Sequence, residues 1–447
     1  MPLPQDSAGR HINYRVQPGG PLTGYLRVPG DKSISHRAVM LGAIAEGVTN
    51  ISGFLEGEDA LATVEAFRAL GVAIEGPDKG RVRIHGVGLH GLKKPAADLY
   101  LGNAGTAMRL LAGLMAGQEF SVTLRGDRSL TKRPMDRVAN PLREMGIQVD
   151  TAAAGRPPIT IYGGRPKNLH YVMPMASAQV KSCVLLAGLY AEGETSTIEP
   201  APTRDHTERM LQGFGYPVTI EGNRASLTGG GTLKAIDIDV PADISSAAFF
   251  MVAASIAPGS DITLQHVGIN ATRDGIIHIL KLMGADIELL NQRSVGGEAV
   301  ADIRVRYAPL TGIEIPEQYV PLAIDEFPVL FVAAACADGK TVLTGARELR
   351  VKESDRIQAM ADGLQALGVN AQPRADGMII EGSHDSTIGG GDVDTHDDHR
   401  IAMSFTVAAL RAAAPITVNN CAHVATSFPG FVELAQAAGI RIEQQVV

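Results

Sequence analysis

Stretches of small apolar residues recur along this chain in one repeated setting. They occupy residues 38–47, 106–117, 180–193, 247–259, 328–339 and 401–414, and all except the last end in glycine. Segments that are apolar nearly all round are typical of helices buried on most of their faces. The pattern therefore predicts six buried helices in six internal repeats.

A second pattern lies between these stretches: an amphipathic helix, then a glycine, then a strand. The six glycines are Gly71, Gly146, Gly215, Gly284, Gly368 and Gly439. Glycine is the expected residue where a helix closes in a left-handed conformation and the chain turns into a strand. Each repeat is then strand, helix, strand, helix, strand, with a further hairpin strand such as residues 81–84. This alternation predicts an α/β fold.

The repeats fall into two groups of three around a polar, glycine-rich junction at residues 228–232. We therefore expect two similar domains with a cleft between them. Domain II spans residues 24–239 and opens with a strand at 25–28. Domain I combines residues 240–447 with residues 1–23. Because domain II begins with the strand at 25–28, residues 1–23 are not needed in it and can cross to domain I.

Composition narrows the possible functions. A formal net charge of −8 argues against the broad basic face that nucleic acids require. The start of the chain lacks the apolar core of a signal peptide, and no apolar run reaches membrane-spanning length, so we expect a soluble cytoplasmic protein. Cys183, Cys336 and Cys421 lie in or beside apolar runs without metal-ligand spacing, which favours buried thiols.

Polar and charged residues gather at the start of each predicted buried helix. By repeat, they are Lys32, Ser33 and Arg37; Asn103, Gly105, Thr106 and Arg109; Ser177, Ala178, Gln179 and Lys181; Asp243, Ser245 and Ser246; Asp325 and Glu326; and Asp394, His396, Asp397, Asp398, His399 and Arg400. Free N–H groups and the helix dipole favour an anion at such a start. If the repeats are equivalent, these six starts face the cleft and form a site for a multiply charged anion. A capped helix start with solvated charges is the alternative for any one of them.

The predicted outer helices begin with further charges, at residues 128–133, 204–208, 272–273 and 352–356. The spacing of Lys352 and Arg356 predicts that they share one helical face, with Glu353 beside them in a perturbed protonation equilibrium. A solvated ladder of i,i+4 charges is the alternative.

Several familiar motifs are absent. Gly86, Gly88 and Gly91 match the dinucleotide-binding spacing, but Lys-Lys-Pro follows instead of a helix. The acids and histidines at residues 392–399 are a possible metal cluster, yet their place at a helix start favours a cap with catalytic groups. We therefore expect no metal and no cofactor.

Seven short runs carry a resemblance that covers nearly the whole chain. They are Gly-Asp-Lys-Ser at 30–33, Leu-Gly-Asn-Ala-Gly-Thr at 101–106, Lys-Arg-Pro at 132–134, Ser-Ala-Gln-Val-Lys at 177–181, Ile-Asp-Glu at 324–326, Lys-Glu-Ser-Asp-Arg at 352–356 and Asp-His-Arg at 398–400. In order and spacing they resemble the EPSP synthase family of 3-phosphoshikimate 1-carboxyvinyltransferases. Arg-x-His-x-Glu at 204–208 and Asn-x-Thr-Arg at 270–273 resemble its class II branch.

The resemblance implies a two-domain inside-out α/β barrel, with three βαβαββ units in each domain. It implies transfer of the enolpyruvyl group of phosphoenolpyruvate to the 5-hydroxyl of shikimate 3-phosphate, through a tetrahedral intermediate that loses phosphate. It also implies that glyphosate is an inhibitor. A monomer that binds neither nucleic acid nor membrane is expected.

Residue roles also follow from the resemblance. Shikimate 3-phosphate would be held by Lys32, Ser33, Arg37, Ser177, Ala178, Gln179, Arg204, Asp325 and Lys352. Phosphoenolpyruvate would be held by Lys32, Asn103, Gly105, Arg133, Gln179, Arg356 and Arg400. Asp325 would be the base on the 5-hydroxyl, Lys32 and Glu353 would move the proton at the methylene carbon, and His399 would assist.

Two positions depart from the family pattern. Many relatives carry a lysine near the C-terminal Ser/Thr-Phe-Pro, which is absent at residues 425–429 here. Strongly glyphosate-tolerant class II relatives carry alanine where this chain has Gly105, so we expect appreciable sensitivity.

Two other functions remain open. One is carboxyvinyl transfer to UDP-N-acetylglucosamine, which usually involves a reactive cysteine in a mobile loop. The other is a non-enzymatic two-domain anion-binding protein.

Overall fold

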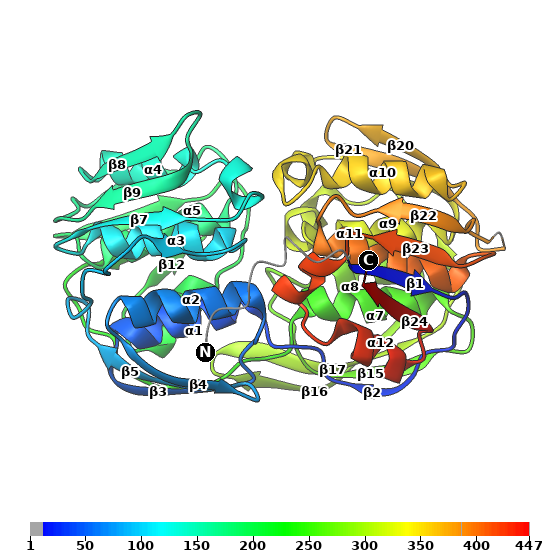
Figure 1. Cartoon of the computed structure of the whole chain (residues 1–447), viewed down its shortest axis with the longest axis horizontal. Helices are drawn as coiled ribbons and strands as arrows, with labels where there is room; N and C mark the ends of the chain where they lie inside the picture. The colour runs from blue at the N-terminus through cyan, green and yellow to red at the C-terminus, as the bar shows by residue number, and fades with distance from the viewer. Residues whose placement is uncertain (1–11, 386, 447) are drawn as a thin grey trace. The chain divides into compact units, whose positions relative to one another are not determined.

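The computed structural model of the chain describes residues 12–385 and 387–446, and Figure 1 labels its helices and strands. These residues divide into two compact units. Unit 2 consists of Gly30–Val240 and Val295–Glu298, and unit 1 contains the other described residues. The sequence places the boundaries near Thr23 and Val240, whereas the chain changes unit after Pro29 and after Val240. The N-terminal segment expected to cross to domain I is described only from residue 12 onward.

The six sheets in the described part of the chain follow one pattern of four strands, in which a parallel pair at one edge is followed by an antiparallel strand. In unit 2 they are β14 (Asp237–Asp239), β3 (Glu46–Ser52), β5 (Arg81–Val87) and β4 (Ala73–Asp78); β6 (Leu99–Tyr100), β7 (Ser121–Arg125), β9 (Arg156–Tyr162) and β8 (Gln148–Ala152); and β10 (His170–Val172), β11 (Glu194–Ile198), β13 (Arg224–Thr228) and β12 (Thr219–Glu221). In unit 1 they are β2 (Thr23–Leu26), β15 (Asp261–Gly268), β17 (Glu298–Arg306) and β16 (Asp286–Val295); β18 (Leu310–Thr311), β19 (Ala337–Leu343), β21 (Gly377–Gly382) and β20 (Asn370–Arg374); and β22 (Gly391–Asp394), β23 (Ile416–Asn419), β1 (Ile12–Val16) and β24 (Ile442–Val446).

Each repeat contains one inner and one outer helix. The inner helices are α1 (Lys32–Ile44), α3 (Gly105–Ala116), α5 (Ala178–Gly188), α7 (Ile244–Ile256), α9 (Phe327–Ala335) and α11 (His399–Ala408). The outer helices are α2 (Glu58–Ala69), α4 (Asp136–Glu144), α6 (His206–Gly213), α8 (Gly275–Leu282), α10 (Arg356–Ala366) and α12 (Phe431–Ala438). Short 3-10 helices are η2 (Leu130–Lys132), η3 (Glu317–Tyr319), η4 (Pro321–Ala323), η5 (Arg347–Val351), η6 (Ala409–Arg411) and η7 (Ala422–Thr426).

Inner helices pack against one another within each unit, with sheets around them, as in an inside-out α/β barrel (Figure 1). Every residue of α7 is buried, as its apolar sequence predicts. Helix α1 begins at Lys32, so it contains the polar run that precedes the apolar stretch at 38–47. Among the described residues, none of the helices is both long and apolar enough to cross a bilayer.

The helix-closing glycines are confirmed in all six repeats. Their φ angles are positive, between +78° and +110°, at the positions where the outer helices end. An L-residue is disfavoured there because its Cβ would clash with the backbone.

The strand that opens repeat one is not the one that the sequence predicts. The predicted strand at 25–28 appears as β2, and it pairs in parallel with β15 of repeat four. The equivalent place beside β3 of repeat one is taken by β14, from the end of unit 2. Repeats one and four lie where the chain passes from one unit to the other. Each takes its edge strand from the segment that the sequence order would give to the other, and residues 24–29 therefore belong to unit 1.

Candidate active site

The start of α1 holds Lys32 against the start of α2. Asp31 caps α1 by accepting a hydrogen bond from the backbone N–H of Ile34 at 2.8 Å. Lys32 Nζ lies 3.0 Å from Oδ2 of Asp59, a buried carboxylate in the first turn of α2. Asp59 was not among the predicted site residues, although an acid in the first turn of an outer helix is visible in the sequence. This ion pair orients the amine of Lys32.

Arg37 joins three helices. Its Nε donates to Thr207 Oγ1 at 2.7 Å, and its Nη2 donates to Ser182 Oγ at 2.9 Å. Its Nη1 donates to the carbonyl of Ser33 at 3.0 Å. The guanidinium is buried, and Arg37 links the second turn of α1 to the N-terminal halves of α5 and α6.

His36 lies between the two cations of α1 and is fully buried. Burial, together with the charges of Lys32 and Arg37, lowers the pKa of His36 to about 3. Its Nδ1 shares a 2.8 Å hydrogen bond with Thr63 Oγ1 of α2. His36 is therefore neutral at pH 7, and it packs α1 against α2 without adding charge.

The start of α3 positions a second cation. Arg133 donates through Nη2 to Asn103 Oδ1, and Asn103 Nδ2 donates to Asp127 Oδ2 at 2.9 Å. Gly105 is the first residue of α3. A Cβ atom at Gly105 would lie 3.0 Å from Arg133 Nη1, closer than ordinary van der Waals contact. Because glycine has no Cβ, Gly105 leaves room for the Arg133 guanidinium.

The start of α5 is tied to α3 through an amide. Ser177 is the N-cap of α5 and Ala178 is its first residue. Gln179 accepts from Arg109 Nη1 and donates to Thr106 Oγ1 at 2.8 Å. Arg37 thus links α1 to α5 and α6, and Gln179 links α5 to α3, within unit 2. The same unit contains many of the predicted residues, namely Lys32, Ser33, Arg37, Asn103, Gly105, Arg133, Ser177, Ala178, Gln179 and, in the loop before α6, Arg204.

In unit 1, Arg356 is surrounded by three carboxylates. Its Nε donates to Asp398 Oδ2 at 2.8 Å, its Nη2 to Glu353 Oε2 at 2.6 Å and its Nη1 to Asp325 Oδ1 at 3.3 Å. Burial opposes the charge of Arg356, but the three carboxylates outweigh it and raise the arginine pKa. Burial likewise opposes the Asp398 carboxylate, while Arg356 holds the Asp398 pKa below its usual range. Both groups are thus charged at pH 7.

Asp325 also faces a second cation. Lys352 Nζ lies 3.4 Å from Asp325 Oδ1, and Arg400 Nη1 donates to the Asp325 carbonyl at 2.9 Å. The predicted helical face shared by Lys352 and Arg356 is wrong, because α10 begins only at Arg356 and Lys352 directly follows η5 as its C-cap. Their common partner Asp325 brings the two cations together.

A buried chain of polar contacts leads to Arg400. The sequence did not predict these contacts. Arg273 Nη2 donates to Ser245 Oγ at 2.6 Å and lies 3.2 Å from Asp243 Oδ1. The Ser245 hydroxyl donates to Glu326 Oε1, which lies 3.8 Å from Arg400 Nη1. The sequence placed all five of these residues at helix starts, but their mutual contacts depend on packing between repeats four, five and six.

His399 is the first residue of α11 and is buried beside Asp398, whose carboxylate caps that helix by accepting from the Arg400 backbone N–H at 2.9 Å. The cap predicted for this segment is therefore present. Across residues 12–385 and 387–446, no three His, Cys, Asp or Glu side chains are grouped as a metal would require.

The three cysteines are buried, as predicted. Burial raises the pKa of each thiol, most modestly for Cys336, to about 12. Protonated, inaccessible thiols do not provide a reactive loop cysteine.

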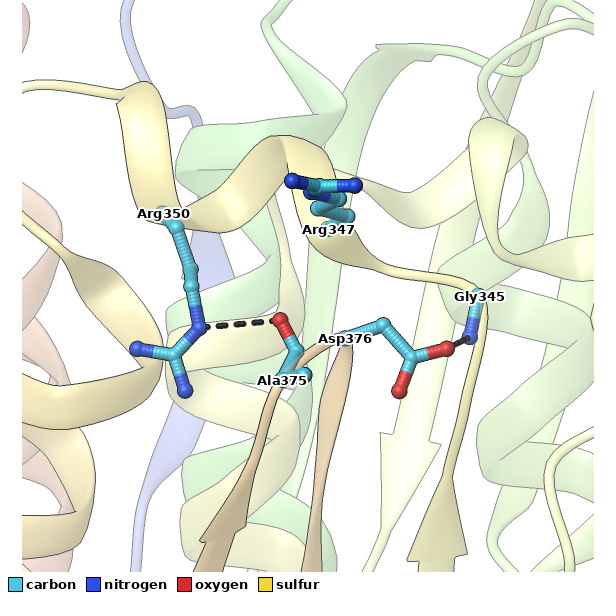
Figure 2. Close-up of a pocket in the computed structure, with 5 residues that line it drawn as sticks. All are labelled: Gly345, Arg347, Arg350, Ala375 and Asp376. Carbon is cyan, nitrogen blue, oxygen red and sulfur yellow. Dashed lines mark hydrogen bonds between the residues drawn. The ribbon is translucent and has the colours of Figure 1, made fainter.

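A surface pocket of about 620 Å³ lies between η5 and the β20–β21 turn (Figure 2). Arg350 Nε donates to the Ala375 carbonyl at 2.9 Å, and Asp376 accepts from the Gly345 N–H at 3.0 Å. No predicted site residue lines this pocket. Its polar groups serve to fasten η5, the segment that leads into Lys352.

Together, the fold and the cationic helix starts define a class: a protein of two three-repeat inside-out α/β barrels whose helix N-termini suit anionic substrates. Residues 16–434 match the model of the EPSP synthase family, 3-phosphoshikimate 1-carboxyvinyltransferase. The chain belongs to this family.

Similar proteins cover nearly the whole chain. The 3-phosphoshikimate 1-carboxyvinyltransferase of Methylococcus capsulatus is 66% identical over 97% of this chain and 99% of its own length. That of Alkalilimnicola ehrlichii is 65% identical over 96% of each chain. A solved EPSP synthase from Acinetobacter baumannii is 59% identical, with a TM-score of 0.88 over 97% of this chain and 100% of its own. The enolpyruvyl transferase NikO from Streptomyces tendae, 17% identical with a TM-score of 0.79, shares the fold.

Proposed function

We propose that this chain transfers the enolpyruvyl group of phosphoenolpyruvate to the 5-hydroxyl of shikimate 3-phosphate and releases phosphate. Besides family membership, one structural observation carries the proposal. Five of the expected site residues are each the first residue of a helix: Lys32 of α1, Gly105 of α3, Ala178 of α5, Arg356 of α10 and His399 of α11. Helix starts provide N–H groups and positive potential for phosphate and carboxylate.

Shikimate 3-phosphate is assigned to nine residues. They are Lys32, Ser33, Arg37, Ser177, Ala178, Gln179, Arg204, Asp325 and Lys352. The starts of α1 and α5, joined by the contacts of Arg37, supply N–H donors for the phosphate. Arg204 supplies a planar cation suited to paired oxyanion contacts.

Phosphoenolpyruvate is assigned to seven residues, four of which are cations. They are Lys32 and Arg133, with Asn103, Gly105 and Gln179, and then Arg356 and Arg400. The contacts of Arg356 with its carboxylates use four of its five N–H groups. One N–H remains for the substrate, so Arg133 and Arg400 carry most of the direct contact, and Arg356 mainly orders the carboxylates.

Proton transfer is assigned to the partly exposed acids. Of the three carboxylates around Arg356, Asp398 is fully buried, while the Asp325 and Glu353 side chains are 12% and 18% exposed. A group that exchanges a proton with substrate must reach it. Asp325 is therefore the proposed base on the 5-hydroxyl, Glu353 and Lys32 move the proton at the methylene carbon, and His399 assists.

Phosphate release tests the reaction. Purified protein with phosphoenolpyruvate should release phosphate only when shikimate 3-phosphate is added, and glyphosate should inhibit in competition with phosphoenolpyruvate. UDP-N-acetylglucosamine should not replace shikimate 3-phosphate, since the described cysteines are buried. Release with the nucleotide sugar alone would establish the sister activity instead, and no release with either acceptor would favour a binding protein.

Two further properties belong to the proposal: that the protein is a monomer, and that it acts in the cytoplasm. Sedimentation equilibrium measures the first, and cell fractionation followed by the phosphate-release assay measures the second.

A further inference from the structure

Three charged residues form a buried cluster in unit 2 that no step of the proposed reaction uses. Lys181 Nζ lies 2.7 Å from Glu208 Oε1 and 3.2 Å from Glu199 Oε2. The Lys181 and Glu208 side chains are only 3% and 2% exposed. We call Lys181, Glu199 and Glu208 the Lys181 cluster. Buried ion pairs often contribute little net stability, because removing charges from water offsets their attraction. A positional role is therefore the better explanation for its presence.

The cluster fastens the first turn of α5 to the first turn of α6. The Lys181 backbone N–H donates to the carbonyl of Ser177, the N-cap of α5, at 3.0 Å. Glu208 lies in the first turn of α6. The adjacent pair, Ser182 and Thr207, share a hydrogen bond of 2.7 Å between their hydroxyls. Two neighbouring side-chain pairs thus join the same two turns.

Glu199 extends the cluster to the loop that carries Arg204. Its Oε2 accepts from the Thr203 hydroxyl at 2.5 Å, and its Oε1 accepts from the Thr203 backbone N–H at 3.3 Å. Thr203 directly precedes Arg204. The backbone of Glu199 is itself held, because it donates to the Asn223 carbonyl at 3.0 Å and accepts from Asn223 Nδ2 at 2.8 Å. The loop is thus anchored on one side by Asn223 and on the other by Lys181.

We propose that the Lys181 cluster, acting through Glu199 and Thr203, positions Arg204 relative to Ser177 for binding shikimate 3-phosphate. This rests on the proposed function, which assigns Arg204 and Ser177 to that substrate. Lys181, Glu199 and Thr203 are positioning residues, since none of them is assigned a contact with substrate. A guanidinium recognises an oxyanion directionally, so a loosened loop must be ordered upon binding and affinity falls.

Thr203→Val tests the contact between Glu199 and the loop of Arg204 without replacing any charged residue. The substitution keeps the shape of the side chain and removes the hydroxyl that donates to Glu199. We expect the KM for shikimate 3-phosphate to rise about ten-fold, as the loss of a hydrogen bond to a charged group implies. The kcat and the KM for phosphoenolpyruvate should stay unchanged, and Thr203→Ser should restore the wild-type KM.

Thr160→Val is the matched control. It also removes one threonine hydroxyl in unit 2, which pairs with Thr123 Oγ1 at 2.9 Å between β9 and β7. All three kinetic parameters should be unchanged in this variant. An unchanged KM for shikimate 3-phosphate in Thr203→Val would overturn the inference. An equal loss in kcat and both KM values would do so as well, since it would indicate general disruption.

Arg204→Ala separates failure of the inference from failure of the proposed function. If Arg204→Ala leaves the KM for shikimate 3-phosphate unchanged, the assignment of Arg204 is wrong. If Arg204→Ala raises that KM while Thr203→Val does not, only the positioning role is overturned. The rise in melting temperature that shikimate 3-phosphate produces without phosphoenolpyruvate, measured on each variant, gives an independent reading of the same affinity.

Discussion

Replacing Gly105 by alanine would place a methyl group against the Arg133 guanidinium. The added Cβ would lie 3.0 Å from Arg133 Nη1, 3.5 Å from Leu130 Cδ1 and 3.6 Å from Arg109 Nη1. Gly105 has no left-handed φ, so the backbone tolerates alanine and the effect is confined to this contact. Arg133 must move by a few tenths of an ångström, and its hydrogen bond to Asn103 restricts that movement.

The expected loss of phosphoenolpyruvate affinity follows from the displacement of the Arg133 guanidinium. A hydrogen bond to a charged group contributes about 1.5–3 kcal/mol. If the shift of Arg133 removes about a third to a half of that, binding of phosphoenolpyruvate weakens by roughly 0.5–1.5 kcal/mol, which is about a two- to twelve-fold rise in its KM. Glyphosate is longer than phosphoenolpyruvate, and we propose that in the same site it would be crowded by the methyl group itself, so its inhibition constant should rise further than the KM.

The assay is steady-state phosphate release at several glyphosate concentrations, for the wild type and for Gly105→Ala. Gly213→Ala in α6 is the control, because its Cβ would meet only Ile236 Cδ1, at 3.7 Å. The wild type should be inhibited by glyphosate, and the control should match it. An inhibition constant for glyphosate that is the same in the wild type and in Gly105→Ala would refute the steric argument.

Three other predictions concern catalysis and pH. Lys32→Met should reduce kcat by at least about a thousand-fold, since a substrate contact and a proton carrier are both lost. Asp325→Ala should reduce kcat by at least about a hundred-fold but change the affinity for shikimate 3-phosphate only slightly. The pKa of His36 is lowered to about 3 in the folded chain from an ordinary value of 6.5. Between these two values the unfolded chain binds a proton that the folded chain does not, so stability should fall by up to about 1.4 kcal/mol per pH unit as the pH is lowered. Replacing His36 by Gln should remove this part of the slope.

For each of these three predictions, one result would contradict it. Near-normal turnover in Lys32→Met, with an unchanged melting temperature, would refute the role of Lys32. If Asp325→Ala weakened only the binding of shikimate 3-phosphate, Asp325 would be a ligand and not the base. For His36, urea unfolding of wild type and His36→Gln from pH 6.5 to pH 4 should give diverging free energies, and parallel curves would contradict the buried, neutral histidine.

Much of the fold was predictable because its signals are local. The helix-closing glycines, such as Gly71 and Gly368, have positive φ as expected, since that backbone conformation depends on the residue itself. Asp31 and Asp398 cap their helices through hydrogen bonds to N–H groups two or three residues away. A pattern repeated six times therefore predicted the units and the helix starts that carry the candidate site.

The contacts within the site were less predictable because they join distant parts of the chain. Asp59 as the partner of Lys32, and Asp325 and Asp398 as partners of Arg356, depend on how neighbouring helices pack. Glu353 is different, because it lies three residues before Arg356 and the sequence already placed it there. The i,i+4 argument for Lys352 failed because a helix must begin before its periodicity applies, and α10 begins only at Arg356.

By itself, then, the amino-acid sequence determined the six α/β repeats, their buried inner helices and the residue types at each helix start. Only the tertiary structure decided which edge strand completes repeat one, because a parallel pair such as β14 with β3 joins segments far apart in the chain. It also decided which charges meet. Residue spacing specifies a partner one helical turn away, whereas the partners of Lys32, Lys181 and Asp325 come from helices and loops that only packing brings together.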